Sequence, residues 1–143
     1  MPAAPDFSLT EFLPYLLNRA AEESSGDFAK IYKGRHGLLR TEWRVLFHLG
    51  QFGAMTATEI GQRSKIHKTK ISRAVAALQQ RRLLTRTKNE SDRRSEQLTL
   101  TATGRKMFEA LSTAAMRYNE SLLAEIPPED RATFLRCLKR LIE

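Results

Sequence analysis

The sequence has 143 residues, a length that suits one domain with a modest core, and its net charge is +8. It contains no run of about 18 apolar residues and no basic leader followed by an apolar stretch, so we expect neither a transmembrane helix nor a secretory signal. The single cysteine, Cys137, cannot form an internal disulfide, and the spacings of metal ligands are absent, so we expect a cytoplasmic protein without metal or cofactor.

Helical spacing dominates the first part of the chain. Apolar residues recur every three or four positions, which predicts a long N-terminal helix within residues 8–36. Pro14 belongs in its first turn or at a kink, because proline cannot donate an interior helical hydrogen bond. A second, short helix is predicted around Trp43, ended by Gly50 and Gly53.

The next segment has the pattern of two short helices joined by a tight turn. Thr56 and Glu59 have the spacing of a capping box, which predicts the start of a third helix. After a break near Lys65, residues 67–81 predict a fourth helix, whose buried stripe is Ile71, Val75 and Leu78. Its opposite face is basic, so the pair predicts a helix-turn-helix with residues 67–81 as the recognition helix.

Alternating β-type residues then predict a hairpin over residues 83–100, so residues 39–100 would form a winged helix-turn-helix. The polar loop "NESDRRSEQ" at its tip is longer than a turn requires. Residues 101–143 predict two more helices, the first capped by Thr101 and the second beginning at Pro128. The expected fold is mainly α-helical with a small β-hairpin wing.

The first helix and the last two helices are too apolar for a core of this size. Packed within one chain, they would leave broad apolar stripes in water, and large exposed apolar patches usually mark interfaces. We therefore expect residues 1–143 to be a single domain that forms a homodimer through its N- and C-terminal helices.

Positive charge is concentrated in residues 60–100. This segment has eleven Lys or Arg and three acidic residues, so it carries a net charge equal to that of the whole chain, +8. Such a footprint is typical of a protein that binds a polyanion, and we predict double-stranded DNA as the partner. The candidate contacts of the recognition helix are His67, Lys68, Thr69, Lys70, Ser72 and Arg73. The wing adds Arg86, Asp92, Arg93 and Arg94.

The acidic residue within the basic loop has a predicted role. Asp92 would hold Arg94 in a bidentate pair, which limits the side-chain freedom that Arg94 loses when it enters a narrow minor groove. Arg93 or Arg86 would then contact phosphates. A solvated turn whose charges screen one another remains the alternative.

Two other classes of function stay open. A non-specific basic protein, binding RNA or organising nucleic acid, would need exposed aromatic residues on which bases stack. The basic segment has no large aromatic side chain, which favours duplex DNA and disfavours a membrane surface. An enzyme is disfavoured, because the chain has no Gly-rich phosphate loop, nucleophile elbow or zinc-protease motif.

The segments "EWRVLFHLG", "TEIGQRSKIHKTKISRAVAALQQRRLLTR" and "SDRRSEQLTLTATGR" resemble the MarR (multiple-antibiotic-resistance regulator) family of bacterial transcription factors. The most specific marks are Asp92 and Arg94 in the wing, and Leu100, Thr101 and Gly104 after it. The resemblance implies a winged-helix homodimer on a pseudo-palindromic operator, with a small aromatic or phenolic effector. We accordingly predict a transcriptional repressor that a ligand releases from DNA.

Three residues depart from the family pattern. Lys65 stands where glycine is common in the turn, so this turn is expected to be strained or differently wound. Arg82 occupies a position that is commonly glycine before the first wing strand. His67 replaces a short capping residue, which predicts a weaker start for the recognition helix.

The single tryptophan and the single cysteine are both expected to have structural rather than functional roles. Trp43 is expected in the core, although an effector pocket, if present, could be lined by Trp43 with Arg40 or His36 near its mouth. Cys137 lies in the apolar repeat of the last helix, so we expect a small buried hydrophobic residue rather than a redox sensor.

Overall fold

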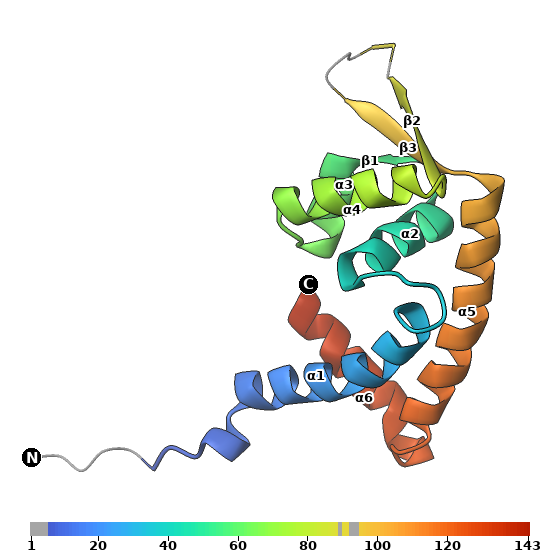
Figure 1. The fold of residues 1–143 in the computed structure, drawn as a ribbon. Coiled ribbons are helices and arrows are strands. Elements are labelled where there is room, and N and C mark those ends of the chain that lie inside the picture. The colour runs from blue at the N-terminus through green and yellow to red at the C-terminus, as the bar shows by residue number, and fades with distance from the viewer. Residues whose placement is uncertain (1–5, 89, 92–94) are drawn as a thin grey trace, which may run out of the picture.

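The computed structural model describes residues 6–88, 90–91 and 95–143. The elements in chain order are the 3-10 turn η1 (Leu9–Glu11), α1 (Leu13–Tyr32), α2 (Arg40–Phe52), β1 (Met55–Thr56), α3 (Ala57–Ser64), α4 (Lys68–Gln80), β2 (Leu84–Lys88), β3 (Glu96–Leu100), α5 (Ala102–Leu123) and α6 (Pro128–Ile142) (Figure 1). The predicted fold class, mainly α-helical with a β-hairpin wing, is confirmed.

The N-terminal helix is shorter than the predicted one. Residues Leu9–Glu11 form a separate 3-10 turn, and Phe12 is extended with ψ 119°, so α1 starts only at Leu13. Pro14 lies in the first turn of α1, where the missing amide hydrogen leaves no helical acceptor unpaired. At the other end α1 stops at Tyr32, and the chain turns through Gly37, whose φ is +64°.

The wing belongs to a three-stranded antiparallel sheet of order β1-β3-β2. The predicted hairpin is formed by β2 and β3, with Leu84 paired to Leu100 at its base. The sequence did not predict β1, whose Met55 pairs with Leu98 of β3. A strand of two residues is too short to display alternation, so only the partner strand reveals it.

The buried core lies between α2, α4 and the sheet. The predicted stripe of α4 is buried, and α2 contributes the other large group of core residues, Val45, Leu46 and Leu49. Phe28 and Tyr32 near the end of α1 join the same cluster. Because the stripe of α4 faces this core, the opposite face of α4 is left in solvent.

Side-chain caps set the starts of α3 and α5. Thr56 Oγ1 accepts a hydrogen bond from the Glu59 amide at 3.1 Å, which confirms one half of the predicted capping box. Thr101 Oγ1 accepts from the Gly104 amide at 3.0 Å, as predicted for the start of α5. Both caps satisfy amides that have no acceptor within their own helix.

The last helix packs little against the rest of the chain. α5 runs from the wing to the opposite end of the molecule, where α1 and α6 lie (Figure 1). No residue of α6 is buried. Cys137 is exposed, so the expectation that it is a buried hydrophobic residue is wrong for this chain alone. The physical reason is that α6 meets no apolar surface large enough to cover its own stripe.

No helix within residues 6–88, 90–91 and 95–143 combines the length and the apolar character needed to cross a membrane. In the same ranges, no three His, Cys, Asp or Glu side chains gather as a candidate metal site.

Candidate nucleic-acid interface and an adjoining aromatic cavity

The first turns of α4 present the predicted contact residues to solvent. The six candidates are all exposed: His67, Lys68, Thr69, Lys70, Ser72 and Arg73. His67 starts the helix, because its Nδ1 accepts a hydrogen bond from the Thr69 amide at 3.2 Å. The side chains of Lys68, Lys70 and Arg73 make no ion pair or hydrogen bond with any residue that the structure describes. Their charges are therefore available to an external anion.

The turn before α4 has the unusual backbone that the sequence suggested. Lys65 ends α3 in the left-handed region, with φ 58° and ψ 32°. Arg82, before the first wing strand, has φ 60°. Both residues thus take the conformation that glycine adopts easily, which costs a residue with a side chain about 1–2 kcal/mol. Each turn keeps its shape because neighbouring hydrogen bonds hold it.

Those neighbouring bonds come from different elements. At the first turn, Arg44 Nη2 of α2 donates to the Ser64 carbonyl at 3.1 Å. At the second turn, Thr101 Oγ1 donates to the Arg82 carbonyl at 2.7 Å. The turn before α4 is therefore bonded to α2, and the turn after α4 is bonded to the residue that caps α5.

The base of the wing is attached to α4 through Arg86. Its Nε donates to Gln79 Oε1 of α4 at 2.7 Å, and its Nη1 lies 3.5 Å from Glu96 Oε2 of β3. The guanidinium is therefore occupied within the chain, and a phosphate contact by Arg86 stays a prediction. Asp92, Arg93 and Arg94 lie outside the described residues, so the predicted pairing of Asp92 with Arg94 is likewise not tested.

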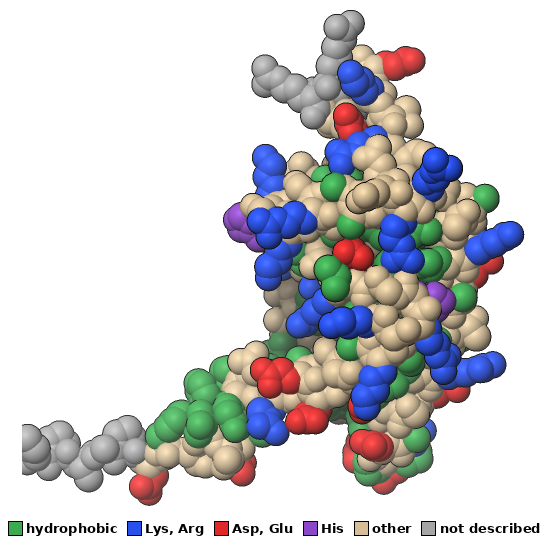
Figure 2. Space-filling model, viewed as in Figure 1, with side chains coloured by type: hydrophobic (Ala, Val, Ile, Leu, Met, Phe, Trp, Pro, Cys, Tyr) green, Lys and Arg blue, Asp and Glu red, His purple; other side chains and the backbone are tan. Residues whose placement is uncertain are grey.

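Lys and Arg side chains are spread over much of the visible face, and they project around the end of the molecule that carries α3, α4 and the wing (Figure 2). Hydrophobic side chains gather at the start of α1, far from that end (Figure 2). The basic end is the candidate nucleic-acid interface.

A cavity of about 490 Å³ lies between α1, α2 and α5. Its lining is rich in aromatic rings: Phe28, Tyr32, Trp43, Phe47 and Tyr118. The Trp43 ring stacks on Phe28 with centroids 5.2 Å apart, and meets Phe47 edge to face at 5.4 Å. Trp43 is half-buried, and its Nε1 is buried without a hydrogen-bond partner among the described residues. A buried N–H of this kind is a donor in need of an acceptor.

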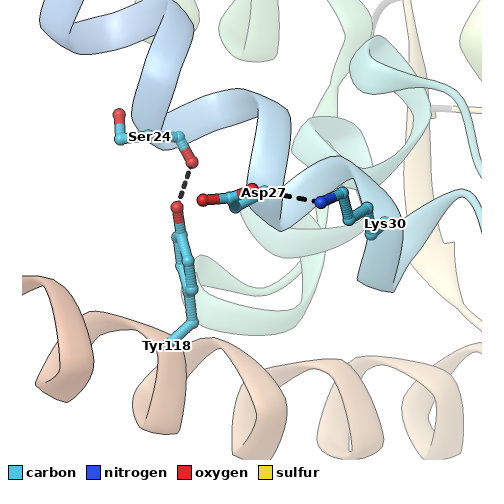
Figure 3. A network of polar contacts seen from close by, with 4 residues as sticks. All are labelled: Ser24, Asp27, Lys30 and Tyr118. Carbon is cyan, nitrogen blue, oxygen red and sulfur yellow. Dashed lines mark hydrogen bonds and ion pairs between the residues drawn. The ribbon is translucent and has the colours of Figure 1, made fainter.

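Tyr118 joins the two helices on either side of this cavity. Its hydroxyl reaches from α5 and donates to the Ser24 carbonyl of α1, beside Asp27 (Figure 3). Asp27 itself pairs with Lys30 at 3.4 Å (Figure 3). Burial, followed by the charges of Asp27 and Glu125, raises the pKa of Tyr118 above its usual value, so the phenol keeps its proton.

Two arginines supply positive charge at the cavity. Arg40 and Arg44 both line it from α2. Burial, and then the neighbouring charge of Arg40, lowers the pKa of the Arg44 guanidinium. Since arginine remains protonated at physiological pH, the lowered pKa reports a charge that lacks solvation and an opposite partner.

The structure distributes the predicted pocket residues unequally. Trp43 and Arg40 line the cavity, whereas His36 is not among its lining residues. The His36 carbonyl instead accepts a hydrogen bond from Arg81 Nη2 at 2.9 Å, and Arg81 also donates to the Gly37 carbonyl. Arg44 was not predicted from the sequence, although its position four residues after Arg40 places the two side chains on the same face of one helix.

Known proteins resemble this chain in sequence and in structure. A family model described as MarR family matches residues 36–95. The helix-turn-helix transcriptional regulator YwoH of Bacillus subtilis is 26% identical over 107 residues, 75% of this chain and 77% of its own. A MarR family regulator from Silicibacter pomeroyi is 28% identical and superposes with a TM-score of 0.82, covering 96% of this chain and 100% of the other.

A third relative, BpsR of Bordetella bronchiseptica, has the same fold at lower sequence identity. It superposes with a TM-score of 0.85 at 23% identity, over 96% of this chain and 97% of BpsR. The family model covers the helix-turn-helix and β2 of the wing but ends before β3, and the structural likenesses extend over the terminal helices as well. Residues 36–95 thus match the MarR family, and the chain as a whole resembles a MarR family transcriptional regulator in sequence and fold.

Proposed function

We propose that this chain is a MarR-family regulator and acts as a homodimeric repressor, which reads a pseudo-palindromic DNA site through α4 and is released from it by a small aromatic acid. The MarR family consists of DNA-binding transcription factors rather than enzymes. The observation that carries the proposal is the unpaired basic face at the start of α4, beside a wing that extends from the same end of the molecule. Such a regulator acts where the chromosome lies, so we place it in the bacterial cytoplasm.

The start of α4 has the chemistry of major-groove recognition. Arg73 and Lys70 can donate to guanine O6 and N7, and Thr69 can contact a thymine methyl group. We assign contacts with the phosphates that border the groove to His67, Lys68 and Ser72. In a dimer, two copies of α4 would read half-sites one helical turn apart, roughly 10 base pairs from centre to centre.

The wing would contact the neighbouring minor groove. We assign that contact to Arg94, oriented by Asp92, and we assign phosphate contacts to Arg93 or Arg86. The network of Arg86 with Gln79 and Glu96 supports a wing that moves together with α4. On this assignment, Arg94→Ala weakens operator binding and lowers the slope of log affinity against log salt by about one unit.

The dimer would form through the apolar residues that the single chain leaves exposed. At the start of α1 these are Phe12, Leu13 and Leu16, and on α6 they are Phe134, Leu135 and Leu141. Each is between 38% and 56% exposed, an unfavourable arrangement for side chains of this size unless another surface covers them. A second copy of the same chain can cover both sets symmetrically. Sedimentation at micromolar concentration tests this step, and a stable monomer would refute it.

The aromatic cavity would bind the effector. An aromatic acid fits its chemistry, because the rings offer stacking partners, Trp43 offers a free N–H, and Arg40 and Arg44 offer charge for a carboxylate. DNA binding by BpsR, which shares the fold, is regulated by 6-hydroxynicotinic acid, itself an aromatic acid. Trp43 is the only tryptophan of the chain, so its fluorescence reports directly on occupation of the cavity.

Binding to genomic duplex fragments over a salt series, with unrelated DNA as competitor, tests the DNA-reading step. We expect selective retention of a fragment that contains an inverted repeat. Arg73→Ala should then weaken binding to that repeat by roughly 5- to 150-fold, since one good base contact is worth about 1–3 kcal/mol. Arg117→Ala removes the same charge from α5, outside the helix-turn-helix, and should leave it unchanged. Equal retention of all fragments would instead support a non-specific architectural protein.

A further inference from the structure

Arg44 connects the cavity to the helix-turn-helix. Its side chain lines the cavity, and its Nη2 donates to the Ser64 carbonyl at 3.1 Å. Ser64 is the last residue of α3, and α4 begins only four positions further along, at Lys68. One guanidinium therefore touches both the space that a ligand would occupy and the turn that sets the position of the recognition helix.

The turn depends on this bond more than an ordinary turn would. The last carbonyls of a helix find no N–H donor within the helix, so the Ser64 carbonyl needs a donor from outside it. The next residue, Lys65, holds a left-handed conformation with φ 58° that only glycine adopts without strain. Ser64 Oγ donates to the Ile60 carbonyl at 2.7 Å, which leaves Arg44 as the donor to its own carbonyl.

The charge around Arg44 favours an anion. Burial and the nearby charge of Arg40 both lower the pKa of Arg44, so the cation is poorly solvated where it stands. A carboxylate can accept two parallel hydrogen bonds from a guanidinium and neutralise its charge, whereas the Ser64 carbonyl accepts one bond and neutralises nothing. A carboxylate in the cavity would therefore compete with Ser64 for Arg44.

We propose that Arg44 is the switch between the cavity and DNA: without a ligand it holds the Ser64 carbonyl and fixes the turn before α4, and a bound carboxylate draws it into the cavity and frees that turn. The inference rests on the proposed function, because it takes the cavity to be the effector site. A freed turn lets Lys65 leave its strained conformation, and α4 then loses the position at which it reads DNA. The ligand shifts the population because it pairs with Arg44 only in the released state.

Arg40 provides the matched control. It lines the same cavity from the same helix, but it makes no hydrogen bond to the helix-turn-helix among the described residues. Removing its charge should weaken the binding of an anion without disturbing the turn. Arg40→Met and Arg44→Met keep the apolar stem of the side chain and remove the same charge, but only Arg44→Met also removes the bond to Ser64.

The experiment uses the full chain with benzoate as the probe and neutral benzamide as its uncharged counterpart. Trp43 fluorescence reports binding, hydrogen exchange of the segment 60–68 reports the turn, and DNA affinity reports the output. Without benzoate, Arg44→Met should bind DNA on the order of tenfold more weakly than wild type, and its segment 60–68 should exchange faster than the same segment of both the wild type and Arg40→Met. Benzoate, but not benzamide, should produce the same local loosening in the wild type.

Each result separates the switch from the effector site. If benzoate changes Trp43 fluorescence in the wild type while exchange of segment 60–68 and DNA affinity stay the same, the switch is overturned and the effector site stands. If benzoate leaves the fluorescence unchanged, the anionic effector site fails, and the switch fails with it. Should Arg44→Met not fold, Arg44→Lys keeps the charge but loses the fork geometry that pairs with a carboxylate, and loosening of segment 60–68 by benzoate to the wild-type extent in that variant would also overturn the proposal.

Discussion

Replacing Gly104 by alanine should separate helix propensity from close packing at the junction of wing and α5. Gly104 is buried in the first turn of α5. A Cβ atom there would lie 2.0 Å from the Leu83 carbonyl oxygen and 3.4 Å from Leu100 Cδ2. Leu83 cannot easily move away, because its carbonyl accepts from the Thr101 amide at 3.0 Å and its amide donates to Leu78 at 2.9 Å.

The net effect follows from two opposing terms. Alanine is favoured over glycine inside a helix by about 1 kcal/mol. Relieving the contact requires a shift of more than an ångström, which breaks the bond between Thr101 and Leu83, worth about 0.5–1.5 kcal/mol, and adds an overpacking cost of about 1–3 kcal/mol. We therefore expect Gly104→Ala to lower the free energy of unfolding by about 0.5–3.5 kcal/mol.

Gly26→Ala is the control for this prediction. Gly26 lies inside α1, and a Cβ atom there would meet nothing within 4 Å. Its replacement should raise the free energy of unfolding by about 0.5–1 kcal/mol, because only the propensity term remains. Urea unfolding, followed through Trp43 fluorescence at one fixed protein concentration, measures both variants. If Gly104→Ala stabilises the protein as Gly26→Ala does, the close approach of α5 to Leu83 is refuted.

Three further predictions concern the turn, a cap and a phenol. Lys65→Gly should stabilise the chain by about 0.5–1 kcal/mol in urea, because relief of left-handed strain exceeds the added flexibility of glycine, and a loss of stability would contradict that strain. Thr101→Ala should cost about 1 kcal/mol in the same assay through the lost cap, whereas Thr113→Ala on the exposed face of α5 should cost much less; equal losses would contradict the cap. Since the pKa of Tyr118 is raised when folded, the unfolded chain loses this proton first, so stability should fall as the pH rises above 10. Tyr118→Phe should make that fall shallower in urea titrations at several alkaline pH values, and an unchanged slope would contradict the assignment.

Local chemistry made much of the architecture predictable from the sequence. The spacing of Ile71, Val75 and Leu78 predicted both the helix and the face that it buries, because side chains three and four positions apart lie on one side of a helix. Thr101 predicted the start of α5 for an equally local reason, since its hydroxyl accepts a hydrogen bond from the amide three residues further along the chain. Even the left-handed turns at Lys65 and Arg82 could be anticipated from the family pattern of glycine.

Features that depend on distant partners were not predictable in this way. β1 exists only because Met55 pairs with Leu98, and no two-residue segment carries a strand pattern by itself. Cys137 was expected inside and lies outside, because its surroundings depend on whether α6 has a surface to pack against. The spacing of apolar residues predicts which face of a helix is apolar, but it does not predict which part of the protein covers that face.

The cavity shows the same division most clearly. Its helices, α1, α2 and α5, could each be read from the order of residues, because helix formation is governed by neighbours a few positions apart. The contact of the Tyr118 hydroxyl with the Ser24 carbonyl, and that of Arg44 with the Ser64 carbonyl, join residues from separate helices. Such contacts follow from the angles and distances at which the helices pack, so they arise only once the chain has folded, and the proposed link between ligand and DNA is among them.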